Sequence, residues 1–153
     1  MTLTINHFGP FYLTYLLIDR VTKANQGRII NVSSALHNLA RDNCLEDLGC
    51  DNKSFSSMQQ YFDSKFFNVL FTVGLDNLLR RNKITNVKVA AVHPGAVDTD
   101  LYGDSFFSKC FKTLCCCFVR KKEAGAKSVT LIASAPFNQI LSGEYYDQNG
   151  KWK

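Results

Sequence analysis

Two short apolar runs, each preceded by a long helical pattern, limit most strongly what this chain can fold into. The first run covers residues 29–32 and the second covers residues 87–92. Both consist mainly of β-branched or small apolar residues and stop at polar residues or glycine, which is typical of buried strands. Strands that alternate with helices form a parallel sheet with helices on both faces. The sequence therefore predicts an α/β domain.

Helical patterns occupy much of the remaining sequence. The range 3–23 is densely apolar, as in a helix packed on a sheet, and Gly9 and Pro10 are expected to disturb its hydrogen bonds. Apolar residues recur at three- and four-residue spacing in 57–81 and 104–118, and a fourth helix is expected at 122–134. Residues 143–146 favour a last short strand. About three strands with flanking helices follow, and one edge of the sheet stays open.

Composition excludes several classes of protein. The chain has 153 residues, 46% of them hydrophobic and 20% charged, which suits one globular domain. The net charge of +5 comes from scattered Lys and Arg residues, which argues against a nucleic-acid partner. We find no secretory signal pattern and no apolar stretch long enough to span a membrane.

The cysteines indicate the compartment rather than a site. None of the six stands in a C-x-x-C pair or at zinc-finger spacing with histidine, so we expect no metal site. Three of them are consecutive, which does not suit a disulfide framework. We interpret them as reduced thiols in an intracellular, cytosol-facing protein. The six are Cys44, Cys50, Cys110, Cys115, Cys116 and Cys117.

Tyr61 and Lys65 carry the clearest chemical signal. They are four residues apart in a predicted helix, so they share a face. A tyrosine ordinarily titrates near pH 10, and a neighbouring cation lowers its pKa by favouring the phenolate. Such a tyrosine can exchange a proton with a carbonyl or an alcohol. Alone, this spacing also fits a surface pair, so the context decides.

The context is polar residues at the ends of both predicted strands. Ser33 and Ser34 follow the first strand, and residues 93–99 follow the second. Ligands of open α/β sheets bind at the carboxyl ends of the strands. The same residues also permit a structural interpretation, in which the serines cap the strand end and His93 has no chemical role.

In this order and spacing, the motifs resemble the short-chain dehydrogenase/reductase family, and within it the retinol-dehydrogenase-like group. The resemblance covers nearly the whole chain and implies a partial Rossmann-like, doubly wound parallel sheet. Residues 1–153 would form one incomplete domain of this type, namely its catalytic and substrate-binding part. The matching segments are residues 6–11, 29–34, 61–65, 93–95, 123–126 and 142–146.

The resemblance assigns roles to individual residues. Tyr61 would be the acid/base, Lys65 would lower its pKa and bind the nicotinamide ribose, and Ser34 would hydrogen-bond the substrate oxygen. Asn6 would support a water relay to Lys65, although an asparagine within a helix can also face solvent or bond to backbone. The cofactor would be NADP(H) or NAD(H), with the resemblance favouring NADP(H). Its nicotinamide side would be lined by Pro94, Gly95, Val97 and Thr99.

The resemblance also implies partners and a location. The phenylalanine-rich pattern at 104–118 favours a lipophilic substrate such as a retinoid, although it also fits ordinary core packing. The family permits homodimers through its two long helices. The aromatic, cysteine-rich and basic segment 106–122 could contact a membrane, with acylation of Cys115, Cys116 or Cys117, or could simply cap the substrate pocket. Association with the endoplasmic reticulum would follow for a longer form.

One family feature is missing from these 153 residues. The family holds the cofactor pyrophosphate on a Gly-rich turn at a helix N-terminus, but the nine glycines of this chain form no G-x-x-x-G-x-G pattern. We therefore expect either part of an active oxidoreductase or a truncated, inactive binding module. An epimerase-type relative also uses Tyr and Lys at this spacing, but residues 6–11 argue against it.

Overall fold

A three-stranded parallel sheet organises the structure, a computed structural model that describes residues 1–48, 56–95, 97 and 122–151. Its strands are β1 (Gly27–Val32), β2 (Val87–Val92) and β3 (Glu144–Tyr146), in the order β1-β2-β3. Gly27 lies opposite Val87 and Val32 opposite Val92, so β1 and β2 end at the same edge. The predicted α/β class and the parallel sheet are confirmed. Within the described residues, nothing pairs with the outer edge of β1.

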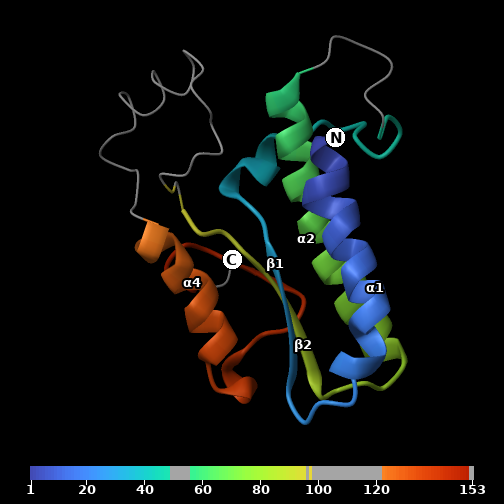
Figure 1. Cartoon of the computed structure of the whole chain (residues 1–153), viewed down its shortest axis with the longest axis vertical. Coiled ribbons are helices and arrows are strands. Elements are labelled where there is room, and N and C mark those ends of the chain that lie inside the picture. The colour runs from blue at the N-terminus through green and yellow to red at the C-terminus, as the bar shows by residue number, and fades with distance from the viewer. Residues whose placement is uncertain (49–55, 96, 98–121, 152–153) are drawn as a thin grey trace.

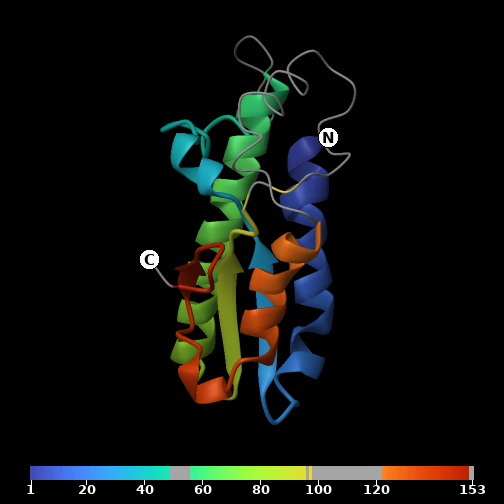
Figure 2. The same ribbon diagram turned by 90° about the vertical axis from the view of Figure 1, so that its left-hand side faces the viewer.

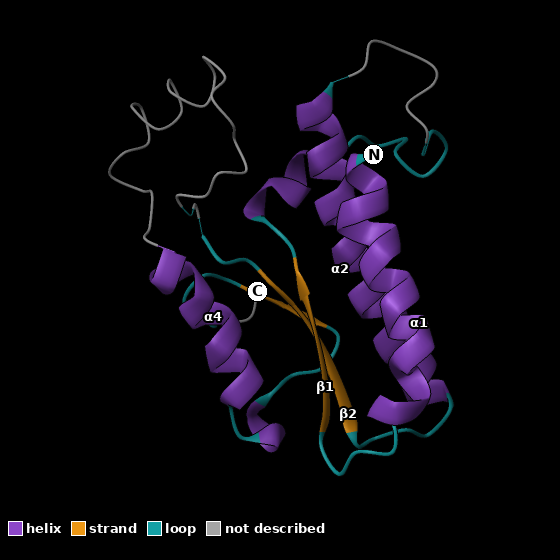
Figure 3. Ribbon diagram, in the orientation of Figure 1, coloured by secondary structure: helices purple, strands orange, loops and turns teal. Residues whose placement is uncertain are grey.

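Helices cover both faces of this sheet. The helices α1 (Gly9–Val21) and α2 (Ser57–Arg81) lie on one face, and α4 (Lys122–Ser134) lies on the other (Figures 1 and 2). Figure 3 shows the resulting order of helix, sheet and helix layers. The predicted helices at 57–81 and 122–134 are confirmed. The predicted helix at 104–118 lies outside the described residues.

The strand β2 is the centre of the core. Val89, Ala91 and Val92 have no exposed surface. Side chains alternate between the two faces of the strand, as its pleat requires. Val87 and Val89 pack with Ile29, Leu75 and Leu79 on the α2 side, whereas Ala90 and Val92 pack with Ile132 and Tyr146 on the α4 side.

The buried face of α2 carries a line of polar side chains. These residues are spaced by four, which places them along one side of the helix, and all of them are buried. Leu70 and Val73, whose spacing helped to predict this helix, are exposed instead. The helix therefore turns part of its apolar surface outward and part of its polar surface inward. The buried polar residues are Gln60, Ser64, Asn68, Thr72 and Asp76.

The first helix opens with a π-helical turn, η1 (Thr4–Phe8), and continues as α1. Gly9 donates its backbone N–H to the carbonyl of Thr4, five residues back. Pro10 has no N–H, so the regular hydrogen bond to the carbonyl of Asn6 cannot form. The expected disturbance at Gly9 and Pro10 is confirmed, and π-turns of this kind are frequent at functional sites.

Much of the apolar surface of α1 is uncovered. Ile18 and Val21 pack against the core, but no residue of α1 is buried. The predicted dense apolar helix is therefore only partly covered by the sheet. Large side chains on it stay at least 45% exposed, namely Phe11, Tyr12, Leu13, Tyr15, Leu16 and Leu17.

Two 3₁₀ helices complete the described structure. The first, η2 (Ala35–Leu39), follows β1. The second, η4 (Phe137–Gln139), leads from α4 toward β3.

Candidate functional site

Tyr61 and Lys65 lie together one turn apart on α2, near the end of the helix that faces the carboxyl edge of the sheet. The Lys65 ammonium is 5.4 Å from the centroid of the Tyr61 ring, within the range of a cation–π contact. Lys65 Nζ also donates a hydrogen bond to the carbonyl of Val32, at 3.2 Å. Burial lowers the pKa of the Lys65 ammonium, because the charged form loses hydration.

Ser33 and Ser34 have different environments at the end of β1. Ser33 Oγ donates to the Lys65 carbonyl at 2.8 Å, which ties the strand to the helix turn that carries the candidate pair. Ser34 Oγ accepts from the backbone N–H of Leu36 at 3.2 Å and caps η2. Both serines are buried. The capping role of Ser34 is thus present, and its proposed contact with a substrate oxygen stays a prediction.

Asn6 lies in the π-helical turn and reaches α2 from the other side. Its side-chain Nδ2 donates to Ser64 Oγ at 3.1 Å, and Ser64 Oγ donates to the Tyr61 carbonyl at 2.7 Å. The Asn6 carbonyl accepts from Asn68 Nδ2 at 3.0 Å. Asn6 is therefore connected to the turn of Tyr61 and Lys65 through neighbouring residues, whereas its part in a proton relay stays a prediction.

The residues assigned to the nicotinamide side follow β2. Pro94 and Gly95 stand directly after the strand end, and Gly95 has a φ of 88°, a conformation that glycine adopts without strain. The Gly95 N–H points to His93 Nδ1 at 3.4 Å. Val97 lies beside Gly125 at the start of α4, close enough that a Cβ on Gly125 would clash with it. Thr99 lies outside the described residues.

Other tyrosines near the sheet are poor candidates for the acid/base. The Tyr146 hydroxyl accepts from the Leu141 N–H at 2.7 Å and donates to the Leu141 carbonyl at 3.2 Å, a structural contact. Burial, with the nearby Asp147 carboxylate, raises the pKa of Tyr145 to about 12, so this phenol keeps its proton. Its ring packs on His37, with 4.7 Å between centroids. Among the described tyrosines, Tyr61 is the one with a lysine ammonium over its ring.

The geometry reveals a pair that the motifs did not point to, the half-buried His7 and the buried Asn68. His7 Nδ1 is 3.0 Å from Asn68 Oδ1. The His7 ring lies 5.4 Å from the Phe67 ring and 6.2 Å from the Phe71 ring. Burial lowers the pKa of His7, and the hydrogen bond to Asn68 Oδ1 opposes this in part. The four-residue spacing of polar side chains in α2 was a signal in the sequence that could have found Asn68.

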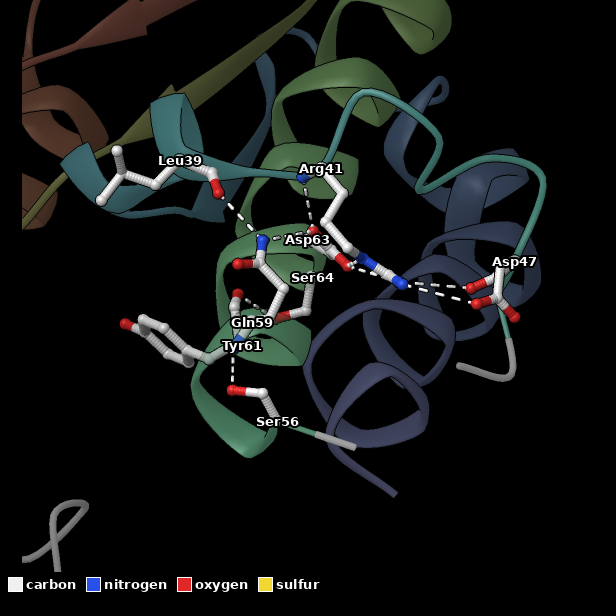
Figure 4. A network of polar contacts seen from close by, with 8 residues as sticks. All are labelled: Leu39, Arg41, Asp47, Ser56, Gln59, Tyr61, Asp63 and Ser64. Carbon is white, nitrogen blue, oxygen red and sulfur yellow. Dashed lines mark hydrogen bonds and ion pairs between the residues drawn. The ribbon is translucent and has the colours of Figure 1, made fainter. Parts of the chain in front are cut away.

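A second missed group is an ion-pair network between the segment after η2 and α2 (Figure 4). Arg41 Nη2 is 2.8 Å from Asp63 Oδ2 and Arg41 Nη1 is 3.4 Å from Asp47 Oδ2. The Arg41 backbone N–H also donates to Asp63 Oδ1 at 3.0 Å. Asp63 is two residues from Tyr61, and Figure 4 shows Tyr61 projecting away from this network. The network fixes the segment after Ser34 onto α2.

The lowered pKa of His7 leads to a pH-dependent prediction. Between the folded-state pKa and the ordinary value of 6.5, the unfolded chain binds a proton that the folded chain does not. The free energy of unfolding should therefore fall as the pH drops from 7.5 through this range. His7→Phe should remove that part of the loss, as measured by urea denaturation between pH 7.5 and 5. His37→Phe, which keeps His7, should retain the full loss, and equal slopes for both variants would contradict the assignment.

Neither a metal site nor a membrane-spanning helix occurs in the part of the chain that the structure describes. No group of three or more His, Cys, Asp or Glu side chains there could hold a metal ion. No helix in the described part of the chain is long and apolar enough to cross a bilayer. The segment proposed to contact a membrane, residues 106–122, falls almost wholly outside the described ranges.

The sequence of this chain is similar to those of known dehydrogenases. No family model matches the chain. It is 34% identical over 146 residues to human retinol dehydrogenase 11, a match that covers 95% of this chain and 44% of that protein. Human retinol dehydrogenase 12 is 36% identical over 144 residues, covering 94% of this chain and 44% of that protein. The chain thus spans less than half the length of these curated relatives.

Solved structures show the same fold. A short chain dehydrogenase from Burkholderia cenocepacia J2315, solved in complex with NADP, superimposes with a TM-score of 0.66. The sequence identity is 20%, and the match covers 95% of this chain and 52% of that one. The arrangement of strands and helices is therefore shared with that protein.

Proposed function

The chain belongs to the short-chain dehydrogenase/reductase family, within its retinol-dehydrogenase-like group. From that premise we propose that it is the catalytic part of an NAD(P)(H)-dependent oxidoreductase. The reaction would interconvert an alcohol and its aldehyde or ketone. The observation that carries the proposal is the Lys65 ammonium 5.4 Å from the Tyr61 ring, on a helix beside the carboxyl edge of a parallel sheet.

The proton step falls to residues of this chain. During reduction, the Tyr61 hydroxyl gives its proton to the carbonyl oxygen, and the nearby Lys65 ammonium stabilises the phenolate that remains. Ser34 donates a hydrogen bond to the same substrate oxygen, and Asn6 supports the return of a proton toward Lys65. The nicotinamide cofactor, when bound, supplies or removes the hydride.

The described residues fit one end of such a cofactor. Tyr61 and Lys65 would hold the nicotinamide ribose, and Pro94, Gly95 and Val97 would line the nicotinamide, together with Thr99. The positive φ of Gly95 lets the backbone turn closely after β2. No Gly-rich turn for the pyrophosphate occurs in these 153 residues. We propose NADP(H) rather than NAD(H), because the resemblance to the retinol-dehydrogenase-like group favours it.

The names of the relatives support a lipophilic substrate of the retinol or retinal type, since human retinol dehydrogenases 11 and 12 match nearly the whole chain. A homodimer through α1 and α2 is also proposed. An apolar groove of about 300 Å³ lies between these helices, lined by Phe11, Thr14, Tyr15, Ile18, Phe71, Gly74, Leu75 and Leu78. Peripheral contact with the endoplasmic reticulum membrane stays a proposal for a longer form.

The competing proposal is a binding module without catalysis. We expect the 153-residue chain alone to bind NADPH weakly, without saturation in the micromolar range, because its sequence has no Gly-rich turn for the pyrophosphate. The measurement is a fluorescence titration, with circular dichroism on the same sample to confirm folding. Saturable micromolar binding by the chain alone would contradict this expectation.

The decisive sample joins the chain to a Gly-rich nucleotide-binding unit from the same family. We expect saturable NADPH binding and reduction of retinal by this fusion. If the fusion binds NADPH but reduces neither retinal nor simpler carbonyls, the oxidoreductase proposal fails and the binding module is favoured.

A further inference from the structure

The Asn68 side chain makes three hydrogen bonds, which connect α2 to two other segments. Its Nδ2 donates to the Asn6 carbonyl at 3.0 Å and to the Val32 carbonyl at 3.1 Å. Its Oδ1 is 3.0 Å from His7 Nδ1. Asn68 is 5% exposed, so water has little access to replace these bonds. The carboxamide thus joins the π-helical turn, the end of β1 and α2 at one point.

These partners fix the orientation of the amide. Backbone carbonyls only accept hydrogen bonds, so the Asn68 NH₂ must face Asn6 and Val32, and the oxygen must face His7. His7 must then donate from Nδ1, which assigns its neutral tautomer as Nδ1–H. The hydrogen-bond partners of Asn68 therefore assign the tautomer of His7, which the position of the ring alone does not give.

Pro10 explains why the Asn6 carbonyl is available. In a regular helix this carbonyl would accept from the N–H of residue 10, which proline lacks. The π-helical turn instead directs the Gly9 N–H to the Thr4 carbonyl. A buried carbonyl without a donor costs about 1–3 kcal/mol, and Asn68 Nδ2 supplies the missing donor. Asn68 thus supplies the donor that Pro10 cannot supply to the Asn6 carbonyl.

The Val32 carbonyl connects this network to the candidate catalytic pair. It accepts from Asn68 Nδ2 at 3.1 Å and from Lys65 Nζ at 3.2 Å, so both side chains share one acceptor. Asn68 is three residues after Lys65 on α2, which places both on the same side of the helix. We infer that Asn68 is a positioning residue, which holds the Val32 carbonyl where it anchors the Lys65 ammonium beside the Tyr61 ring.

This inference rests on the proposed function for its catalytic meaning, but its test does not need activity. The chain is labelled with ¹⁵N in histidine and ¹³C in lysine, and its NMR spectra are recorded without cofactor or substrate. We expect the Nδ1–H tautomer at His7 in the wild-type chain. In Asn68→Leu, we expect a shift of the Lys65 side-chain resonance, assigned by its loss in Lys65→Met, and a loss of the single His7 tautomer.

Thr72→Val is the matched control. Thr72 is also buried on α2, and its Oγ1 accepts from Asn31 Nδ2 at 2.9 Å. This variant removes two buried hydrogen bonds one turn further along the helix, from Asn31 Nδ2 and to the Asn68 carbonyl, and leaves the Asn68 side chain and Val32 in place. Its Lys65 resonance should stay unchanged, which separates positioning from a general loosening of the helix. If Asn68→Leu does not fold, Asn68→Ala removes the same donors and the same acceptor with a smaller side chain and should give the same shifts.

An Nε2–H tautomer at His7 in the wild-type chain would overturn the inference, as would an unmoved Lys65 resonance in a folded Asn68 variant. A chain that shows the expected tautomer and shifts, but no oxidoreductase activity in the fusion, would uphold the positioning role and refute the proposed reaction.

Discussion

Tyr61→Phe is expected to lower carbonyl reduction by about 10³-fold, the middle of the range for a general acid–base residue. The change removes the hydroxyl that would give its proton to the carbonyl oxygen and leaves the ring in place. Lys65 Nζ can still donate to the Val32 carbonyl, because that bond does not involve Tyr61. The measurement is NADPH oxidation with retinal, in the chain joined to a Gly-rich nucleotide-binding unit of its family.

Tyr12→Phe provides the comparison for this result. Tyr12 is 60% exposed on α1, so it loses a hydroxyl in the same way without facing the candidate site. Its activity should match that of the unchanged fusion, and the Kd for NADPH should be similar in both variants. Activity of Tyr61→Phe within about tenfold of the unchanged protein would exclude Tyr61 as the proton donor, since even weak general acid catalysis exceeds that factor.

The layers of the fold could be predicted because they depend on local patterns. The runs at β1 and β2 are apolar enough to be buried on both faces. The long helix between them in the sequence allows the chain to cross over, so that the two strands run parallel. Gly9 and Pro10 are rare inside a helix, so the disturbance at the π-helical turn was also visible in the sequence. The face of each helix that turns inward was harder to predict from the sequence, because the apolar residues Leu70 and Val73 are exposed.

The candidate site could be predicted only in part. Tyr61 and Lys65 are close in sequence, so a helix alone brings them together. Asn68 donates hydrogen bonds to the carbonyls of Asn6 and Val32, which are 62 and 36 residues away in the sequence. A local sequence pattern cannot predict contacts over such separations. Buried polar side chains are retained where long-range partners satisfy them. The polar line on α2 was therefore present in the sequence, but its meaning depended on the tertiary structure.

Arg41→Met is expected to lower the free energy of unfolding by about 3 kcal/mol, the lower end of the range for breaking a buried ion pair. Asp63 is 5% exposed at its side chain, whereas Arg41 is 26% exposed, so losing the arginine leaves a buried carboxylate with weaker partners. Gln59 Nε2 still donates to Asp63 Oδ1 at 3.2 Å, which limits the loss. Urea denaturation at pH 7 measures the change as a lower midpoint with an unchanged slope.

Two comparisons separate the burial of Asp63 from the mere loss of an arginine. Arg81→Met changes an exposed arginine in the last turn of α2, so the cost should stay below about 1 kcal/mol. In Arg41→Met/Asp63→Leu, the second change replaces the orphaned carboxylate with an apolar group. Leu3, Cys44 and Phe67 line the same small cavity as Asp63, which suits a leucine. The double variant should therefore recover most of the lost stability. A double variant as unstable as Arg41→Met would mean that Arg41 acts by holding the segment after Ser34 rather than by neutralising Asp63.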